Sequence, residues 1–318
     1  MILLLGASGY IGSAVAGELM RRKIPFSAPS RKEFPFGSFP PLLDYLRKKK
    51  PDYVIHAAGF TGKPNVDSCE TQREETYAGN VSLALTVAQA CDVAGIRMGY
   101  VSSGCIYTGA KFRDAFGEWK TRDDLTTPEL QPLLESRGDS IAGFTEQDSP
   151  NFSFQRNNCS FYSGTKALAE QVVGSFPDFH VWRIRIPFDE HDHPRNYLSK
   201  IQSYPKLYQN WNSVTHRGDF ARICVDSWLK NIPGGIYNVT HPGYFSTREA
   251  VEAVSLKLKP GWKPEFWADD REFYAQGALT PRSNCILDSA KLARAGLPLR
   301  PLAEALATTL EQWKTGKS

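Results

Sequence analysis

The sequence lacks the features that mark membrane, secreted and nucleic-acid-binding proteins. No stretch of its 318 residues approaches the roughly 18 apolar residues that a membrane span requires. The six cysteines lie far apart, without a C-x-x-C pair or a metal-ligand spacing, which indicates reduced thiols, a cytoplasmic location and no metal site. Lys and Arg number 38 against 34 Asp and Glu, and no block of like charge exceeds residues 47–50, so nothing indicates a nucleic-acid partner. The apolar residues 1–5 run directly into glycines, which favours a buried strand over a secretion signal.

The sequence does contain an alternation of short apolar runs and longer helical patterns. Hydrophobic residues make up 41% and charged residues 23%, an ordinary globular mixture. The pattern predicts strands at residues 2–5, 24–28, 52–57, 98–102 and 179–186, and helices over 11–20, 41–49, 71–94 and from 161 onward. Such an alternation, with strands apolar along their whole length, predicts an α/β fold: a Rossmann-like, doubly wound parallel sheet covered on both faces.

The second half of the chain is more irregular. Residues 107–152 lose periodicity, and a loop of that length is uncommon unless it is a lid or a binding loop. We therefore expect a Rossmann-like domain over 1–188, with a lid-like insertion near 108–150. Residues 189–318 are expected to form mainly a smaller substrate-binding lobe, with some segments returning to the first domain. Helices are predicted near 248–258 and 303–313, followed by a frayed tail at 314–318.

A glycine-rich turn joins the first predicted strand to the first helix. Its spacing is G-x-x-G-x-x-G, and glycines at a helix N-terminus let a pyrophosphate approach the backbone N–H groups. Glycine-rich turns also serve packing alone, but a preceding strand and a following helix favour dinucleotide binding. The expected cofactor contacts are Gly6, Ser8, Gly9, Tyr10, Ile11 and Gly12, together with Ala57, Ala58 and Gly59 after the third strand.

The end of the second strand selects between the two nicotinamide cofactors. An acid there binds the ribose 2′-hydroxyl, whereas an arginine accommodates a 2′-phosphate. The sequence has Ser-Arg-Lys at 30–32 and an acid only at Glu33. This favours NADPH, held by Arg31, over NADH; an ordinary charged surface loop is the alternative. The acidic residue that usually contacts adenine is not evident around residues 34–39.

Tyr162 and Lys166 lie four positions apart, one helical turn, and so share a helix face. A nearby ammonium favours the phenolate and is expected to bring the tyrosine pKa, ordinarily about 10, towards neutrality. Ser103 adds a hydroxyl at the end of the fourth strand, the edge where such sheets bind ligands.

In this order, the glycine turn, the serine and the Tyr-x-x-x-Lys resemble the extended short-chain dehydrogenase/reductase family over nearly the whole chain. The resemblance implies that Ser103 holds the substrate carbonyl, that Tyr162 transfers the proton and that Lys166 also holds the nicotinamide ribose. It places Asn80 where an asparagine supports the lysine or lines the site; a surface or capping role is the alternative.

Four further motifs narrow the resemblance to plant-type nucleotide-rhamnose synthases, which are 3,5-epimerase/4-reductases. They occupy residues 56–70 (HAAGFTGKPNVDSCE), 103–107 (SGCIY), 194–200 (PRNYLSK) and 281–284 (PRSN). Bacterial dTDP-4-dehydrorhamnose reductases and GDP-fucose synthase are more distantly similar. One departure is the spacing of 59 positions between Ser103 and Tyr162 (162 − 103), which is long for this group.

Cys105 and Lys200 are the expected acid–base pair for epimerisation. A 4-keto group acidifies the hydrogens on C3 and C5, and inverting those carbons needs an acid and a base on opposite ring faces. A thiol, with an ordinary pKa of about 8.5, is tuned into this range by a cationic neighbour, and the resemblance supplies Lys200 as its basic partner. A buried structural role for Cys105, and a phosphate contact for Lys200, are the alternatives.

Substrate contacts are expected from polar residues in the same motifs. Arg282 or Arg195 can clamp a diphosphate through a planar guanidinium, or each can be a structural ion-pair partner. His193 and His216 are assigned surface or loop roles. The remaining expected substrate contacts are Asn65, Ser103, Asn196 and Asn284.

The resulting expectation is an NADPH-dependent enzyme that epimerises and then reduces a nucleotide-linked 4-keto-6-deoxyhexose, with UDP-4-keto-6-deoxyglucose to UDP-L-rhamnose as the best candidate. One alternative is a 4-reductase without epimerase activity. The other is a non-catalytic protein that senses NADP, against which the retained Tyr162 argues. The expected partner is a nucleotide sugar, and a homodimer is left open.

Overall fold

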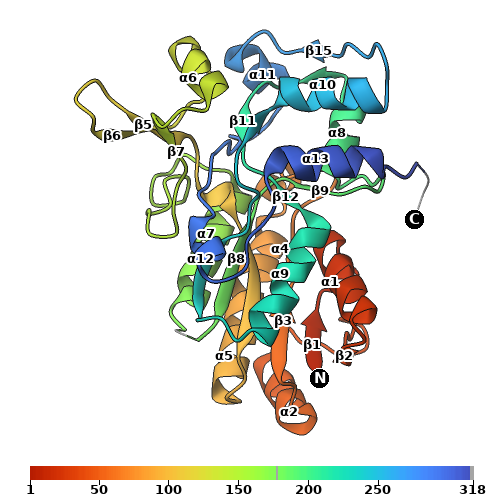
Figure 1. Cartoon of the computed structure of the whole chain (residues 1–318). Coiled ribbons are helices and arrows are strands. Elements are labelled where there is room, and N and C mark those ends of the chain that lie inside the picture. The colour runs from red at the N-terminus through yellow and green to blue at the C-terminus, as the bar shows by residue number, and fades with distance from the viewer. Residues whose placement is uncertain (177, 316–318) are drawn as a thin grey trace.

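The computed structural model describes residues 1–176 and 178–315, which build a six-stranded parallel sheet with helices on both faces (Figure 1). The strand order is β13-β8-β4-β3-β1-β2. The strands are β1 (Ile2–Leu5), β2 (Phe26–Ser27), β3 (Tyr53–His56), β4 (Met98–Ser103), β8 (His180–Ile184) and β13 (Gly235–Asn238). The α/β class and the parallel sheet predicted from the sequence are confirmed.

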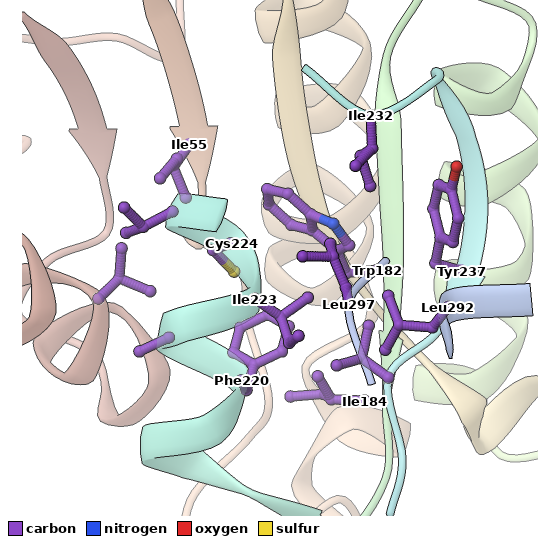
Figure 2. Packing of buried hydrophobic residues seen from close by; sticks show 14 of the residues in the cluster. Ile55, Trp182, Ile184, Phe220, Ile223, Cys224, Ile232, Tyr237, Leu292 and Leu297 are labelled. Carbon is purple, nitrogen blue, oxygen red and sulfur yellow. The ribbon is translucent and has the colours of Figure 1, made fainter. Parts of the chain in front are cut away.

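Two layers of apolar side chains hold the helices on the sheet. One face packs against α1 (Tyr10–Arg21), α9 (Arg217–Leu229) and α12 (Ala290–Arg294). Figure 2 shows Trp182 of β8 in this layer, with Phe220 and Ile223 of α9 and Leu297 close by. The opposite face packs against α2 (Phe39–Lys49), α5 (Leu83–Val93) and α7 (Phe161–Gly174). All residues of β1 and β3 are buried, as a sheet covered on both sides requires.

The long helix predicted over 71–94 is largely confirmed, because residues 73–93 are helical without a break. It is not a regular α-helix throughout: a short helix, α3 (Ser68–Thr71), precedes it, and α4 (Arg73–Tyr77) continues through a π-helical turn (Ala78–Ser82) into α5. The wider turn contains Asn80, whose amide is buried and hydrogen-bonded to backbone groups of Phe60. Single π-turns of this kind often accompany functional sites.

The segment 107–152, for which the sequence showed no periodicity, is partly regular. It forms a three-stranded antiparallel sheet in the order β6 (Trp119–Arg122), β5 (Ala110–Arg113) and β7 (Ile141–Ala142), and α6 (Gln131–Ser136) lies between β6 and β7 in the chain. Leu125, Leu130 and Leu134 pack with Trp211 of β11 in one cluster. The insertion is therefore packed against the C-terminal lobe, with short 3-10 turns at Gly104–Ile106 and Pro128–Leu130.

The C-terminal half divides between the sheet domain and a separate lobe. α9 and β13 complete the sheet domain, whereas α8 (Tyr197–Ser203), α10 (Thr247–Lys257) and α13 (Leu302–Glu311) share a smaller core. Lys314 is hydrogen-bonded to Glu190 and Asp192, so the predicted fraying does not hold there; residues 316–318 lie outside the described part. The remaining elements are β9 (Pro187–Phe188), β10 (Lys206–Leu207), β11 (Trp211–Asn212), β12 (Thr215–His216), β14 (Phe245–Ser246), β15 (Glu265–Phe266) and α11 (Asp270–Gln276).

Within residues 1–176 and 178–315, none of the helices combines the length and the apolar character needed to cross a bilayer.

Candidate active site

The glycine-rich turn forms a cradle that only glycine fits. Gly6 has φ +91°, and a Cβ there would lie 2.5 Å from the backbone nitrogen of Ala58. A Cβ on Gly12 would lie 2.0 Å from the Gly6 carbonyl oxygen. Ser8 and Gly9 are exposed directly before α1. The cradle thus brings the helix N-terminus, with its free N–H groups, against the Ala57–Gly59 segment, which is the geometry that a dinucleotide pyrophosphate needs.

Tyr10 and Ile11 differ in where their side chains lie. Ile11 packs against the hydrophobic core, so any cofactor contact from it comes from its backbone. The Tyr10 ring stacks on His193, with centroids 4.7 Å apart. His193 lies in the loop before α8 and is half-buried, which agrees with the surface or loop role expected for it, although its ring also packs on Tyr10. The surface or loop role expected of His216 is wrong, because that ring is buried at the N-terminus of α9, 3.3 Å from the Glu190 carboxylate.

Arg31 lies exposed after β2, near the carboxyl end of β3. Its charge, together with burial and with the charge of Lys166, lowers the pKa of His56 to about 3. Burial is the largest of these causes. The Glu33 carboxylate accepts a hydrogen bond from the Ser30 backbone and is turned onto its own loop. Arg31 is thus placed at the edge where the cofactor cradle lies.

Ser103 ends β4 beside the proposed proton donors. Burial raises the pKa of Tyr162 well above its ordinary value, while a hydrogen bond with Ser103 opposes the rise. The expectation that this pKa falls towards neutrality is corrected: desolvation of the phenolate outweighs every favourable contact. The phenol remains a proton donor at neutral pH.

The ammonium of Lys166 is anchored to β4. It donates to the Tyr100 hydroxyl (2.5 Å) and to the Val101 carbonyl (2.9 Å), and burial lowers its pKa to about 8. Because Lys166 is held by these two groups, its position in the site is fixed by the neighbouring strand and not by Tyr162.

Asn80 connects the loop after β3 to α7. Its amide accepts from the Phe60 N–H (2.8 Å) and donates to the Phe60 carbonyl (2.9 Å) and the Thr165 hydroxyl (3.2 Å). Thr165 in turn donates to the Tyr162 carbonyl. Asn80 therefore supports the helix of Tyr162 from inside the protein, which rules out the surface alternative.

Cys105 lies in the 3-10 turn after β4 and is only 7% exposed. Burial raises the pKa of its thiol, opposed by hydrogen bonds with Ser103 and Ser163. The nearby cations of Arg185 and Lys166 also favour the thiolate. Desolvation outweighs these effects, so the thiol stays protonated and is suited to donate a proton.

Lys200 lies on α8 among other cations. Burial lowers the pKa of Lys200, and the charges of Arg195 and Arg282 lower it further. Arg195 donates to Thr61 and to the Gly62 carbonyl, in the loop after β3. This environment favours the neutral amine, which is the form that accepts a proton.

Arg282 forms an ion pair with Asp67 (2.6 Å), so the alternative role of a structural ion-pair partner is confirmed for this arginine. However, Nη1 of Arg282 and Oδ1 of Asp67 are buried without a hydrogen-bond partner among the described residues. Buried polar atoms are normally paired, so these two atoms mark a place where a polar ligand is expected.

The three predicted asparagines are placed differently. Asn65 accepts from the Asp67 N–H in the loop after β3, and Asn284 accepts from Asn212. Asn196 is fully buried and its amide is used within the protein, which speaks against direct substrate contact.

Sequence reasoning missed Glu70. Its carboxylate accepts from the Phe161 N–H (2.7 Å), at the start of the helix of Tyr162, and from the Thr280 hydroxyl (2.8 Å). Both acids of the motif at 56–70 therefore bind the segment at 280–282. The only signal in the sequence was that both acids lie in the motif at 56–70; their partners at 280–282 lie far along the chain.

Fold and site together define a Rossmann-like oxidoreductase of the short-chain dehydrogenase/reductase type. Residues 1–130 match the RmlD substrate binding domain family model. A bifunctional dTDP-4-dehydrorhamnose 3,5-epimerase/dTDP-4-dehydrorhamnose reductase from Arabidopsis thaliana is 31% identical over 96% of this chain and 90% of its own length. The chain belongs to this family of rhamnose-forming epimerases and reductases.

Two further proteins are similar to the chain, one in sequence and one in fold. A trifunctional UDP-glucose 4,6-dehydratase/epimerase/reductase of Arabidopsis thaliana is 32% identical over 92% of this chain, which spans only 39% of that protein. The crystal structure of the L780 UDP-rhamnose synthase from Acanthamoeba polyphaga mimivirus superposes with a TM-score of 0.81 over 98% of each chain, at 23% identity, and confirms the fold.

Proposed function

We propose that the chain epimerises C3 and C5 of a nucleotide-linked 4-keto-6-deoxyhexose and then reduces C4 with NADPH. The observation that carries this is the gathering of Ser103, Cys105 and Tyr162 at the carboxyl end of β4. The similarity to a trifunctional enzyme named for UDP sugars supports UDP-4-keto-6-deoxyglucose as substrate and UDP-L-rhamnose as product. The bifunctional relative, named for dTDP sugars, supports the combination of epimerase and reductase. A bacterial dTDP-4-dehydrorhamnose reductase of similar fold (TM-score 0.74), solved with NADP, supports the cofactor.

The residues present fit a dinucleotide. The Gly6–Gly12 cradle would receive its pyrophosphate, Arg31 its 2′-phosphate and Lys166 its nicotinamide ribose, and Ala57–Gly59 would line it. When bound, NADPH supplies the hydride for C4.

Epimerisation requires one group that accepts a proton and one that donates it. Lys200, whose pKa is lowered, takes the proton from C3 or C5, and the electron pair of the broken C–H bond forms the enolate of the 4-keto group. Cys105, whose pKa is raised, returns a proton to the same carbon from the other face. The lowered pKa thus supports Lys200 as the group that accepts the proton, and the raised pKa supports Cys105 as the group that donates it.

Reduction uses the neighbouring hydroxyls. Ser103 donates a hydrogen bond to the C4 oxygen, and Tyr162 delivers its proton to that oxygen as the carbonyl becomes an alcohol. A phenol whose pKa is raised by burial is protonated when this step begins. The diphosphate of the substrate is assigned to Arg195 and to the unpaired Nη1 of Arg282.

Deuterium incorporation tests the proposal. In heavy water without NADPH, the protein is expected to exchange hydrogen at C3 and C5 of UDP-4-keto-6-deoxyglucose. With NADPH, it should oxidise the cofactor and form UDP-L-rhamnose. Parallel reactions with dTDP- and GDP-linked keto sugars identify the preferred nucleotide.

A 4-reductase without epimerase activity is the second candidate, and the burial of Cys105 favours it. In that case NADPH oxidation occurs only with a sugar that is already epimerised, and no deuterium enters C3 or C5.

A further inference from the structure

Asp189 lies directly after β9, between the cofactor cradle and the helix that carries Lys200. It is 4% exposed, and its carboxylate contacts residues from three elements. Oδ1 accepts from the Tyr10 hydroxyl (3.1 Å) and from the Asn196 amide (3.0 Å), while Oδ2 pairs with Arg217 (2.5 Å). A buried carboxylate with both oxygens engaged fixes the relative position of the groups that it binds.

The first of these contacts holds the glycine turn. Tyr10 is the first residue of α1, inside the G-x-x-G-x-x-G sequence. Its ring lies between the His193 ring and the Arg217 guanidinium, whose centre is 4.4 Å from the ring centroid. Asp189 thus orients Tyr10 both directly and through Arg217.

The second contact holds α8. Asn196 is the N-terminal cap of this helix: its amide oxygen accepts from the Leu198 N–H, and its amide nitrogen also donates to the carbonyls of Asp189 and His191. The backbone N–H of Lys200 donates to the Asn196 carbonyl (2.9 Å). The Asp189 carboxylate therefore contacts Asn196, and Asn196 in turn binds the backbone of Lys200 in the first turn of α8.

We propose that Asp189 is a positioning residue that fixes the dinucleotide turn relative to the helix of the epimerisation base. This rests on the proposed function for the role of Lys200. Asp189 does not need to touch the substrate for this role. Its replacement is expected to alter cofactor binding through Tyr10 and the position of Lys200 through Asn196.

The chain offers a matched control in a second ion pair that reaches the opposite end of α1. Asp226 of α9 pairs with Arg22 (2.6 Å), at the end of α1 remote from the glycine turn. The Asp226 side chain is 12% exposed, so Asp226→Asn also removes a largely buried ion pair between α1 and α9. It does so without touching the cradle or α8.

The test compares Asp189→Asn with Asp226→Asn in the full chain. Asp189→Asn is expected to raise the Kd for NADPH at least tenfold and to slow C3/C5 deuterium exchange at least tenfold. Asp226→Asn should lower the melting temperature and leave both quantities within twofold of the unchanged protein. If Asp189→Asn lowers the melting temperature alone, or if both variants change binding and exchange equally, Asp189 has only a structural role.

A second variant covers the case in which Asp189→Asn does not fold. Tyr10→Phe removes one hydroxyl and keeps the ring stack, and a three- to tenfold rise in the Kd for NADPH is expected. An unchanged Kd overturns the proposal. If the unchanged protein shows no exchange at C3 or C5, the proposed epimerisation fails, while the comparison of NADPH affinities still decides whether Asp189 holds the cofactor turn.

Discussion

The cofactor half and the substrate half of the site are assembled in opposite ways. The contact between Gly6 and Gly12 lies within one strand–helix turn, so the backbone shape of the cradle is set mainly by neighbours in the sequence, and Ala58 closes it from the end of β3. The substrate half depends on contacts between distant segments: Asp67 and Arg282 lie 215 positions apart, and Glu70 and Thr280 lie 210 apart. The first half is a local backbone shape, whereas the second exists only once both ends of the chain have packed.

This difference predicts how substitutions behave. A change in the cofactor half, here called the local half, alters dinucleotide affinity and leaves the rest of the site in place. A change in the substrate half, here called the assembled half, alters several functions together, because each side chain there positions another segment.

The largest expected effect is that of Tyr162→Phe, which removes the hydroxyl proposed to deliver the proton and keeps the aromatic ring. Positioned general acids typically contribute about 10²- to 10⁴-fold, so kcat for NADPH oxidation should fall by that factor. Steady-state rates with NADPH and the keto sugar measure it.

Tyr237→Phe is the control for Tyr162→Phe, because Tyr237 lies on β13 and its hydroxyl donates to the Pro233 carbonyl, away from the site. C3/C5 exchange should persist in Tyr162→Phe, since Lys200 and Cys105 remain. Retention of full reductase activity in that variant would remove the tyrosine from the mechanism.

Arg282→Gln is expected to have the next largest effect and probes the assembled half. Loss of a charge-assisted contact costs about 1.5–3 kcal/mol, which corresponds to a roughly 10- to 100-fold rise in the KM for the nucleotide sugar. The KM for NADPH should change little. Arg300→Gln, which breaks an ion pair with Asp219, is the control; equal effects of both variants on the sugar KM would contradict the role of Arg282.

The same contrast explains what could be predicted from the sequence. The strands at 2–5 and 52–57 and the cradle followed from local pattern, because apolar runs and glycine spacing act over a few residues. The role of Glu70 and the ring stack of His193 did not, because their partners come from distant segments. The pKa direction of Tyr162 also escaped, since it depends on burial, which no spacing reveals.

Arg31→Ala tests the local half with a smaller expected change. Because Arg31 is exposed, its contact with a 2′-phosphate is partly screened, and a three- to tenfold rise in the KM for NADPH is expected. The KM for NADH should stay constant. Lys48→Ala, on the surface of α2, is a control for the loss of one positive charge. A parallel rise for both cofactors would show that Arg31 does not select the phosphate.

The smallest expected effect concerns stability and not catalysis. Contacts with the Asp219 and Glu190 carboxylates raise the pKa of His216 although burial opposes them. A raised folded-state pKa means that the stabilisation is complete below the unfolded value, about 6.5, and is lost as the pH rises through the folded-state value.

His216→Asn keeps a side chain suited to cap α9 but cannot titrate. Urea unfolding from about pH 5.5 to about pH 8.5, which starts below the ordinary histidine pKa, should show a smaller loss of stability with rising pH in the variant. Identical pH dependence in the two proteins would mean that the two carboxylates do not hold the imidazolium form. Because His216 lies in β12, which pairs with β9 directly before Asp189 and Glu190, a confirmed difference would show that charge helps to hold these two strands together.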